Sequence, residues 1–252
     1  METTPAFFVV AILAVVLTGF SKSGFGGGLG VMAVPMMSLC VTPQFAAAVM
    51  MPILLTMDVL IVWRYRVTWN RTIVQNLLPA AILGLIAGSL LFRYMDANTV
   101  KFLIGLLAAF FVFRFAVSLR YEQTVRQTPK PIVFGLGFLS GFSSFIAHAG
   151  GPPVKGYLLQ QQLGKTWFVG TNTVFFFVLN LLKTIAYGAV GTLSHSSLYI
   201  SALLAPFLLL GIGVGFLLHR RVDQAVFVKV VYGFLALTAL RLLYDSQRAF
   251  FG

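Results

Sequence analysis

The hydrophobic residues of this chain form apolar runs that fill nearly its whole length and are separated by short polar segments. A helix that crosses a bilayer needs about 20 mostly apolar residues, because the hydrocarbon core is about 30 Å thick. The runs long enough to meet this requirement are residues 44–63, 74–92, 97–118, 166–190, 197–218 and 224–244. The pattern therefore predicts an all-α integral membrane protein.

Two further apolar segments are interrupted by glycine-rich stretches. The first consists of residues 5–20 and 29–41 around "SKSGFGGG", and the second of residues 131–146 and 152–163 around "AHAGG". Each piece has 12 to 16 residues and is therefore shorter than a spanning helix. We expect each pair to form a broken helical hairpin that enters and leaves the membrane on one side.

The chain contains an internal repeat. Residues 77–96, "LLPAAILGLIAGSLLFRYMD", align with residues 204–223, "LAPFLLLGIGVGFLLHRRVD", at a constant offset of 127 positions. The alignment matches rare residues as well as leucines: Pro79, Gly84, Gly88, Arg93 and Asp96 coincide with Pro206, Gly211, Gly215, Arg220 and Asp223. Earlier in each half, "LTGFS" at 17–21 matches "LSGFS" at 139–143 at an offset of 122. Such self-similarity indicates a duplication.

Each half is expected to contain one hairpin and three full crossings. Because three is an odd number, the second half must be inverted in the membrane relative to the first. The predicted fold is thus two inverted repeats, each a broken helical hairpin plus three transmembrane helices. The expected boundaries are 1–119 for the first repeat, 120–131 for a cytoplasmic linker and 132–252 for the second repeat.

The charged residues indicate the orientation in the membrane. The chain has 18 Lys and Arg against 6 Asp and Glu, a net charge of +12, and most of these residues lie between apolar runs. The loop after the first full span carries Arg64, Arg66 and Arg71, whereas its repeat equivalent, "GTLSHSS", has no Lys or Arg. Because basic loops face the cytoplasm, we expect both termini outside, in a bacterial inner membrane.

The two breaks predict a ligand site near the middle of the membrane. Glycine-interrupted segments at matching places in two inverted halves are typical of transporter binding sites, although glycines also serve close helix packing. In the second break, Pro152 and Pro153 favour the first turn of a new helix, whose free N–H groups attract anions. Lys22, Lys155 and Lys183 at membrane depth favour the same kind of ligand. The alternative for Lys22 and Lys155 is snorkelling to the membrane interface.

The candidate ligand-binding residues come from both halves. The first half supplies Ser21, Lys22, Ser23 and the amides of Gly26, Gly27 and Gly28. The second half supplies Ser143, Ser144, His148, the amides of Gly150 and Gly151, Lys155, Thr171 and Asn172. We expect these groups to hold a small anionic substrate between the two breaks.

Four polar residues at membrane depth each have more than one interpretation. Asp58 either carries a coupling proton or pairs with Lys183, or it is a near-surface counterion of an arginine in the following loop. Asn180 and Lys183 lie roughly on the helical side of Asn172, and they either line the cavity or hydrogen-bond between helices. His148 either contacts the ligand or titrates, or it is a capped structural histidine.

Several function classes lack support in the sequence. No G-x-x-x-x-G-K-[ST] motif for ATP is present, so energy for transport has to come from an ion gradient, a substrate gradient or a partner protein. Cys40 is the only cysteine, which rules out an intramolecular disulfide and a cysteine cluster for metal. The chain has no H-E-x-x-H motif for a membrane-embedded enzyme and no nucleic-acid pattern. We expect the lipid bilayer and a small anion as partners and no cofactor or metal; the oligomeric state, a homodimer included, stays open.

The stretches "SGFGGGLGVMAVP", "AHAGGPPVKGYLL" and "VGTNTVFFFVLNLLK" resemble the TauE/SafE family of membrane transporters, named for sulfite export, over about residues 7–244. The resemblance implies transport of sulfite, thiosulfate or organosulfonates. The chain departs from the usual pattern at Ala147, His148 and Ala149, where a fuller glycine run is common. We expect a secondary transporter that works by alternating access, with proton coupling as an option. An anion channel is the main alternative, and an enzyme is a weaker one.

Overall fold

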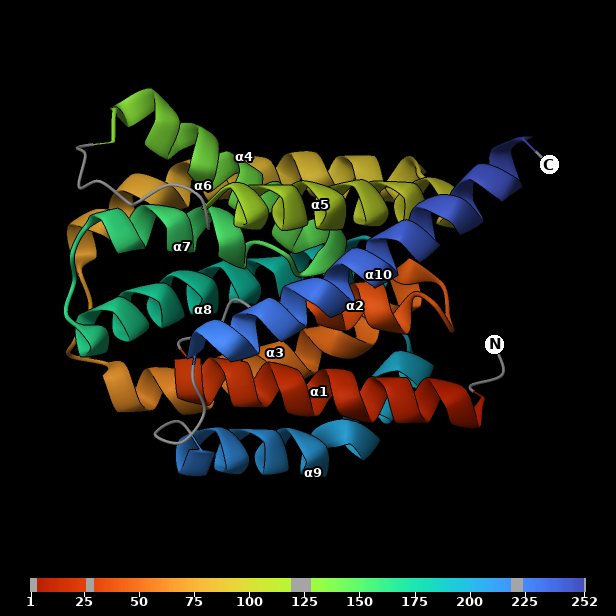
Figure 1. Ribbon diagram of the computed structural model, residues 1–252, viewed down its shortest axis with the longest axis horizontal. Helices are drawn as coiled ribbons and strands as arrows, with labels where there is room; N and C mark the ends of the chain where they lie inside the picture. Colours follow the sequence, from red (N-terminus) through yellow and green to blue (C-terminus); the bar gives the residue numbers. More distant parts are fainter. Residues whose placement is uncertain (1–3, 26–29, 119–127, 219–223, 252) are drawn as a thin grey trace.

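The computed structural model describes residues 4–25, 30–118, 128–218 and 224–251, which contain helices and no strands (Figure 1). The long helices are α1 Pro5–Phe25, α3 Pro43–Tyr65, α4 Arg71–Tyr94, α5 Ala97–Ser118, α6 Lys130–Ala147, α8 Lys165–Ala189, α9 His195–Leu218 and α10 Gln224–Phe251. The short ones are the 3-10 helix η1 Gly30–Met32, α2 Ala33–Met37 and α7 Gly151–Gln160. Within the described residues, seven helices, all the long ones except α10, are long and apolar enough to cross a membrane. The predicted all-α integral membrane protein is confirmed.

The broken hairpins have unequal arms, so the expectation of four short pieces is wrong. α1 has 21 residues and continues through Ser21, Lys22 and Ser23, and α6 has 18 residues, so both are long enough to cross a membrane. The returning arms are short: η1 and α2 have 3 and 5 residues, and α7 has 10. Serine does not end α1, because its hydroxyl bonds the carbonyl one turn back, as the Ser23 hydroxyl does to Gly19 O at 2.9 Å.

The second break is a tight turn between α6 and α7. His148 adopts the left-handed conformation there, with a φ of 52°. The amides of His148 and Ala149 donate to the carbonyls of Ser144 and Ser143 at 3.0 and 3.1 Å, which closes the C-terminus of α6. The two prolines lie in the first turn of α7, where the missing N–H has no partner to lose.

The main helix pairs each join one helix from the first half of the chain to one from the second half. α1 packs against α9, α4 against α6, α3 against α8 and α5 against α10. The sequence repeat relates α1 to α6, α3 to α8, α4 to α9 and α5 to α10. The contact between α1 and α9 is therefore the repeat counterpart of the contact between α6 and α4. α3 and α8 run in opposite directions, as do α5 and α10, and the first turn of α1 lies toward the same end of the molecule as the last turn of α10 (Figure 1). The halves therefore interlock.

Glycines shared by the repeat allow these helix pairs to approach closely. A Cβ on Gly84 of α4 would lie 2.0 Å from Phe138 O of α6, and one on its counterpart Gly211 of α9 would lie 2.6 Å from Val16 O of α1. Both distances are far below a normal contact, so any larger residue would push the backbones apart. The recurrence of these glycines is explained by close helix packing.

Asp96, another residue shared by the repeat, anchors the start of α5. Its carboxylate accepts hydrogen bonds from the amides of Asn98 and Thr99 at 3.2 and 3.3 Å and from the Thr99 hydroxyl. The hydroxyl bond is the main cause that lowers the pKa of Asp96, since it favours the charged form. The repeat counterpart Asp223 lies outside the described residues.

Candidate functional site

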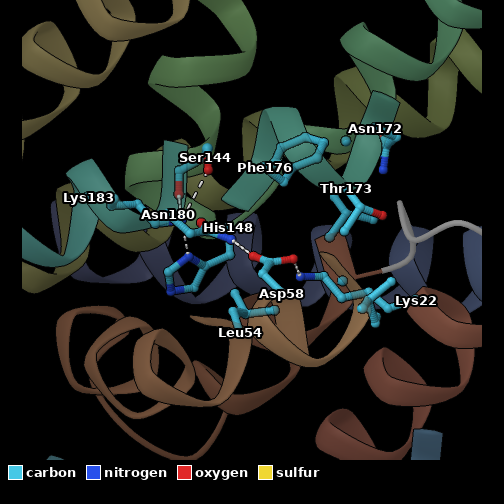
Figure 2. Close-up of a pocket in the computed structure, with 14 residues that line it drawn as sticks. Lys22, Leu54, Asp58, Ser144, His148, Asn172, Thr173, Phe176, Asn180 and Lys183 are labelled. Carbon is cyan, nitrogen blue, oxygen red and sulfur yellow. Dashed lines mark hydrogen bonds and ion pairs between the residues drawn. The ribbon is translucent and has the colours of Figure 1, made fainter. Parts of the chain in front are cut away.

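A cavity lies where α1, α3 and α8 meet the break between α6 and α7 (Figure 2). Its polar lining residues, as far as the structure describes them, are Lys22, Asp58, Ser144, His148, Asn172, Thr173, Asn180 and Lys183. The cavity volume is about 40 Å³, enough for only a few water molecules. Both halves of the chain therefore contribute charged groups to one confined space.

Asp58 is the centre of one polar cluster in this cavity. Lys22 of α1 forms an ion pair with Asp58 Oδ1, and Asn180 Nδ2 of α8 donates to Asp58 Oδ2 at 2.5 Å (Figure 2). The side chain of Asp58 is 1% exposed and that of Lys22 is 14% exposed. The expectation that Asp58 pairs with Lys183 or with a loop arginine is wrong. Lys22 is the partner because α1 packs beside α3.

Lys183 forms a second cluster at the break. Its ammonium group donates to Ser144 O at 3.1 Å, to Ser144 Oγ at 3.0 Å and to His148 Nδ1 at 2.6 Å. His148 Nε2 lies 2.9 Å from Ala47 O of α3. Because a carbonyl only accepts, Nε2 carries the ring hydrogen and Nδ1 accepts from Lys183, so the imidazole is neutral. An ammonium group has three hydrogens, and this network uses all of them.

Several residues of the cavity lining occupy equivalent positions in the two halves. The offset of 122 that relates "LTGFS" to "LSGFS" also relates four pairs of cavity-lining residues: Lys22 to Ser144, Leu54 to Phe176, Asp58 to Asn180 and Ile61 to Lys183. Asp58 and Asn180 hydrogen-bond directly to each other across the site. The lining is thus equivalent in position but not in charge, because the acid belongs to the first half alone.

Three predicted ligand residues make structural hydrogen bonds instead. Ser23 Oγ donates to a carbonyl of α9 at 3.0 Å, and Ser143 Oγ donates to the carbonyl one turn earlier in α6 at 2.6 Å. Thr171 Oγ1 accepts from the amide of Asn70, just before α4, at 2.8 Å. None of the three belongs to the described lining of the cavity.

Ser21, Gly150 and Lys155 also lie outside that lining. Ser21 is buried in α1, and Lys155 is half-buried on α7. Gly150 is the N-cap of α7 and lies at a close approach, because a Cβ there would lie 2.6 Å from Ser140 O. The predicted residues Gly26, Gly27 and Gly28 lie outside the part of the chain that the structure describes.

The structure brings the other predicted residues together and adds some that the sequence did not indicate. The predicted residues in the lining are Lys22, Asp58, Ser144, His148, Gly151, Asn172, Asn180 and Lys183. The unpredicted ones include Thr173 and Phe176 on α8 and Leu54 and Ile61 on α3. Thr173 lies seven residues, or about two helical turns, before Asn180, so counting along one helix face would have found it. The apolar residues have no sequence signal that separates them from packing residues.

Comparison with known families agrees with this architecture. Residues 11–242 match the family model described as Sulfite exporter TauE/SafE, which confirms the resemblance seen in the sequence. Neither the curated proteins nor the solved structures gave a match. The matched range includes both breaks and the described cavity lining. The chain therefore belongs to the TauE/SafE family of membrane transporters of sulfite-type anions.

Proposed function

We propose that the protein is a secondary transporter that carries a small sulfur-containing anion through this cavity by alternating access. The substrate class is sulfite, thiosulfate or an organosulfonate, and transport is coupled to protons. The proposed setting is the bacterial inner membrane, with both termini outside. Family membership supports the class of anion, and the charge of the cavity is the observation that carries the proposal.

The cavity contains more basic than acidic side chains. Its described lining includes two lysines, Lys22 and Lys183, and one acid, Asp58, while His148 is neutral by its hydrogen bonds. Lys22 pairs with Asp58, and Lys183 forms no ion pair among the described residues. Two lysines against one acid favour an anion over a cation as the ligand of this cavity.

Lys22 is the cation that we assign to the substrate. Figure 2 shows Lys22, Thr173 and Asn172 on one side of the cavity, and Lys183, Ser144 and His148 on the other. The Lys22 side chain is 14% exposed, whereas Lys183 is fully buried and donates all its hydrogens to protein atoms. Among the described residues Lys22 bonds to Asp58 alone, so it keeps hydrogens for a ligand.

The arrangement of the two halves supports alternating access. The equivalent helices α3 and α8 run in opposite directions and both line the cavity (Figure 1). In transporters built from inverted repeats, rocking of one half against the other exposes a central site to each side in turn. The contacts of α1 with α9 and of α4 with α6 supply the surfaces between the halves.

Replacement of Lys22 tests the proposed site. We expect Lys22→Ala to weaken sulfonate binding by at least about tenfold, since a hydrogen bond to a charged group contributes roughly 1.5–3 kcal/mol. Lys155→Ala, on α7 outside the described lining, should bind within about twofold of the unmodified protein. Isothermal titration calorimetry measures both affinities. In proteoliposomes, uptake should saturate with sulfonate concentration and respond to an imposed proton gradient.

The control is designed around the partner of Lys22. Lys22→Ala leaves the Asp58 carboxylate without its cation, so the double variant Lys22→Ala/Asp58→Asn is measured beside it, with thermal unfolding as the check on folding. Unchanged sulfonate affinity in both would contradict the assignment of Lys22. Ohmic single-channel currents would show that the protein is an anion channel rather than a carrier.

A further inference from the structure

The carboxylate of Asp58 accepts the hydrogen bonds that an anionic substrate needs. Its carboxylate oxygens accept from Lys22 Nζ and from Asn180 Nδ2, the latter at 2.5 Å. A sulfonate or sulfite presents the same acceptor chemistry, which is a set of oxygens that share negative charge. We propose that Asp58 fills the anion site of the empty protein, and that the substrate displaces it from Lys22 while Asp58 takes up a proton. This inference rests on the proposed function, anion transport through the cavity.

The small volume of the cavity favours a displacement. About 40 Å³ holds a few water molecules, less than a sulfonate group with its three oxygens and its substituent. The carboxylate of Asp58 lies inside this space, 1% exposed, between Lys22 and Asn180. The substrate and the carboxylate therefore compete for one position.

Lys183 is not the cation that changes partners. Its three hydrogens are donated to Ser144 O, Ser144 Oγ and His148 Nδ1, and its side chain has no exposed surface. Lys22 has Asp58 as its one hydrogen-bond partner among the described residues. Two hydrogens of its ammonium group thus have no partner among the described residues, and all three are available when the carboxylate leaves.

The groups that face Asp58 come from three elements. Lys22 belongs to α1, Asn180 and Lys183 to α8, and His148 to the break after α6. Helices α2, α5 and α9 also pack against α3, but they contribute no charged residue to the described lining. Both ring nitrogens of His148 have partners, a backbone carbonyl and Lys183. Asp58 is therefore the group that the substrate leaves without donors.

The exchange keeps the pair of Lys22 and its partner neutral at each stage. In the empty protein the pair is Lys22 and ionised Asp58. When a monoanion takes Lys22, the carboxylate is left buried without its cation, and it takes a proton from water because the charged form is disfavoured. The site then holds Lys22, the anion and neutral Asp58. Asp58 is the one acid inside a predicted span, and its repeat equivalent is an amide, Asn180, which does not take up a proton. One proton therefore crosses the membrane with each monoanion.

Asp58→Asn tests this exchange, because it removes the charge and keeps the shape. Methanesulfonate is the probe, since a sulfonate keeps its charge around neutral pH. Calorimetry in buffers of different ionisation enthalpy should show that the unmodified protein takes up about one proton per anion near pH 7. Its affinity should rise as the pH falls, by up to about tenfold for each pH unit. Asp58→Asn should take up no proton, show no pH dependence and bind at least about tenfold more tightly at pH 8.

His148→Gln is the comparison variant, since His148 is the other titratable group that faces Asp58 and ordinarily changes charge near neutral pH. The pH slope and the proton uptake should persist in this variant. A slope that persists in Asp58→Asn, or binding that weakens there, would overturn the exchange.

The same measurements separate this inference from the proposed function. Sulfonate transport by the unmodified protein with no proton uptake would overturn the exchange and leave the transporter standing. Failure of both the unmodified protein and Asp58→Asn to bind any sulfur anion would reject the proposed function itself. If Asp58→Asn does not fold, as judged by thermal unfolding, proton uptake by the unmodified protein decides the question alone.

Discussion

Polar side chains within these helices are often bonded to carbonyl groups close by in the sequence. The hydroxyls of Thr18, Ser38, Thr173 and Ser246 each donate to the carbonyl four residues earlier at 2.7 Å. Such bonds allow a helix to carry a hydroxyl in apolar surroundings. Lys183 differs, because its acceptors lie 35 and 39 residues away in the sequence, at the break after α6. It therefore ties α8 to the broken hairpin.

Removal of that tie should destabilise the protein. We expect Lys183→Met to lower the free energy of unfolding by about 2–4 kcal/mol, because His148 Nδ1 and Ser144 O stay buried without their donor. Ser144→Ala removes only one of the three bonds and should lower it by about 1 kcal/mol. Denaturant unfolding in detergent micelles compares the two variants. Equal stability of Lys183→Met and the unmodified protein would show that the network does not hold the break in place.

At the scale of elements, the helices that carry the site are positioned by close backbone contacts. A Cβ on Gly141 of α6 would meet Ala81 O of α4 at 1.8 Å, and one on Gly170 of α8 would meet Thr68 O at 1.9 Å. Ser144 follows Gly141 by about one helical turn, so the contact with α4 sets the position of the break. The glycines of this protein thus serve packing as well as the breaks.

The contact at Gly141 can be tested against a glycine on the same helix. Gly141→Ala should lower the free energy of unfolding by about 2–3 kcal/mol, because α4 and α6 must move apart. Gly135→Ala has no described atom within 4 Å of its new Cβ, so it should be neutral or stabilising by up to about 1 kcal/mol. Thermal unfolding in detergent measures both. Similar midpoints for the two variants would show that the backbone approach is not required.

At the scale of the whole molecule, α3 contacts helices of both halves, and a different loop flanks each of its ends. Cys40, before α3, is exposed, and Val67, after α3, is 78% exposed. α3 has 23 residues and the composition of a spanning helix, so we expect these two positions on opposite sides of the membrane. Because arginines follow α3, the positive-inside rule predicts that Val67 faces the cytoplasm.

The single natural cysteine makes this orientation measurable. A membrane-impermeant maleimide added to intact cells should label Cys40, because its side of α3 is expected to face outward. The variant Cys40→Ser/Val67→Cys should be labelled only after the cells are permeabilised, and Cys40→Ser alone should stay unlabelled. The opposite labelling pattern would place both termini in the cytoplasm.

The sequence by itself determined the helical class, five of the six uninterrupted spans and the position of the second break, whereas the predicted span 224–244 is a helix, α10, that is not among the candidate spans of the described residues. These follow from local properties, namely the length of apolar runs and the limits that glycine and proline put on the backbone. The arm lengths of the hairpins were mispredicted because Ser21, Lys22 and Ser23 read as polar breakers. In the structure they continue α1, with the lysine paired to α3 and Ser23 bonded within α1 and to α9.

Only the tertiary structure decided which charges meet. Lys22 and Asp58 are 36 residues apart, and Asn180 is 122 residues from Asp58, so no spacing along the chain indicates that they share one site. In the sequence, Lys183 and Lys22 both favoured an anionic ligand. The structure shows that Lys183 donates its hydrogens to three protein acceptors. Partners of this kind depend on which helix faces pack together, and the packing of α1, α3 and α8 is a property of the folded chain rather than of any one segment.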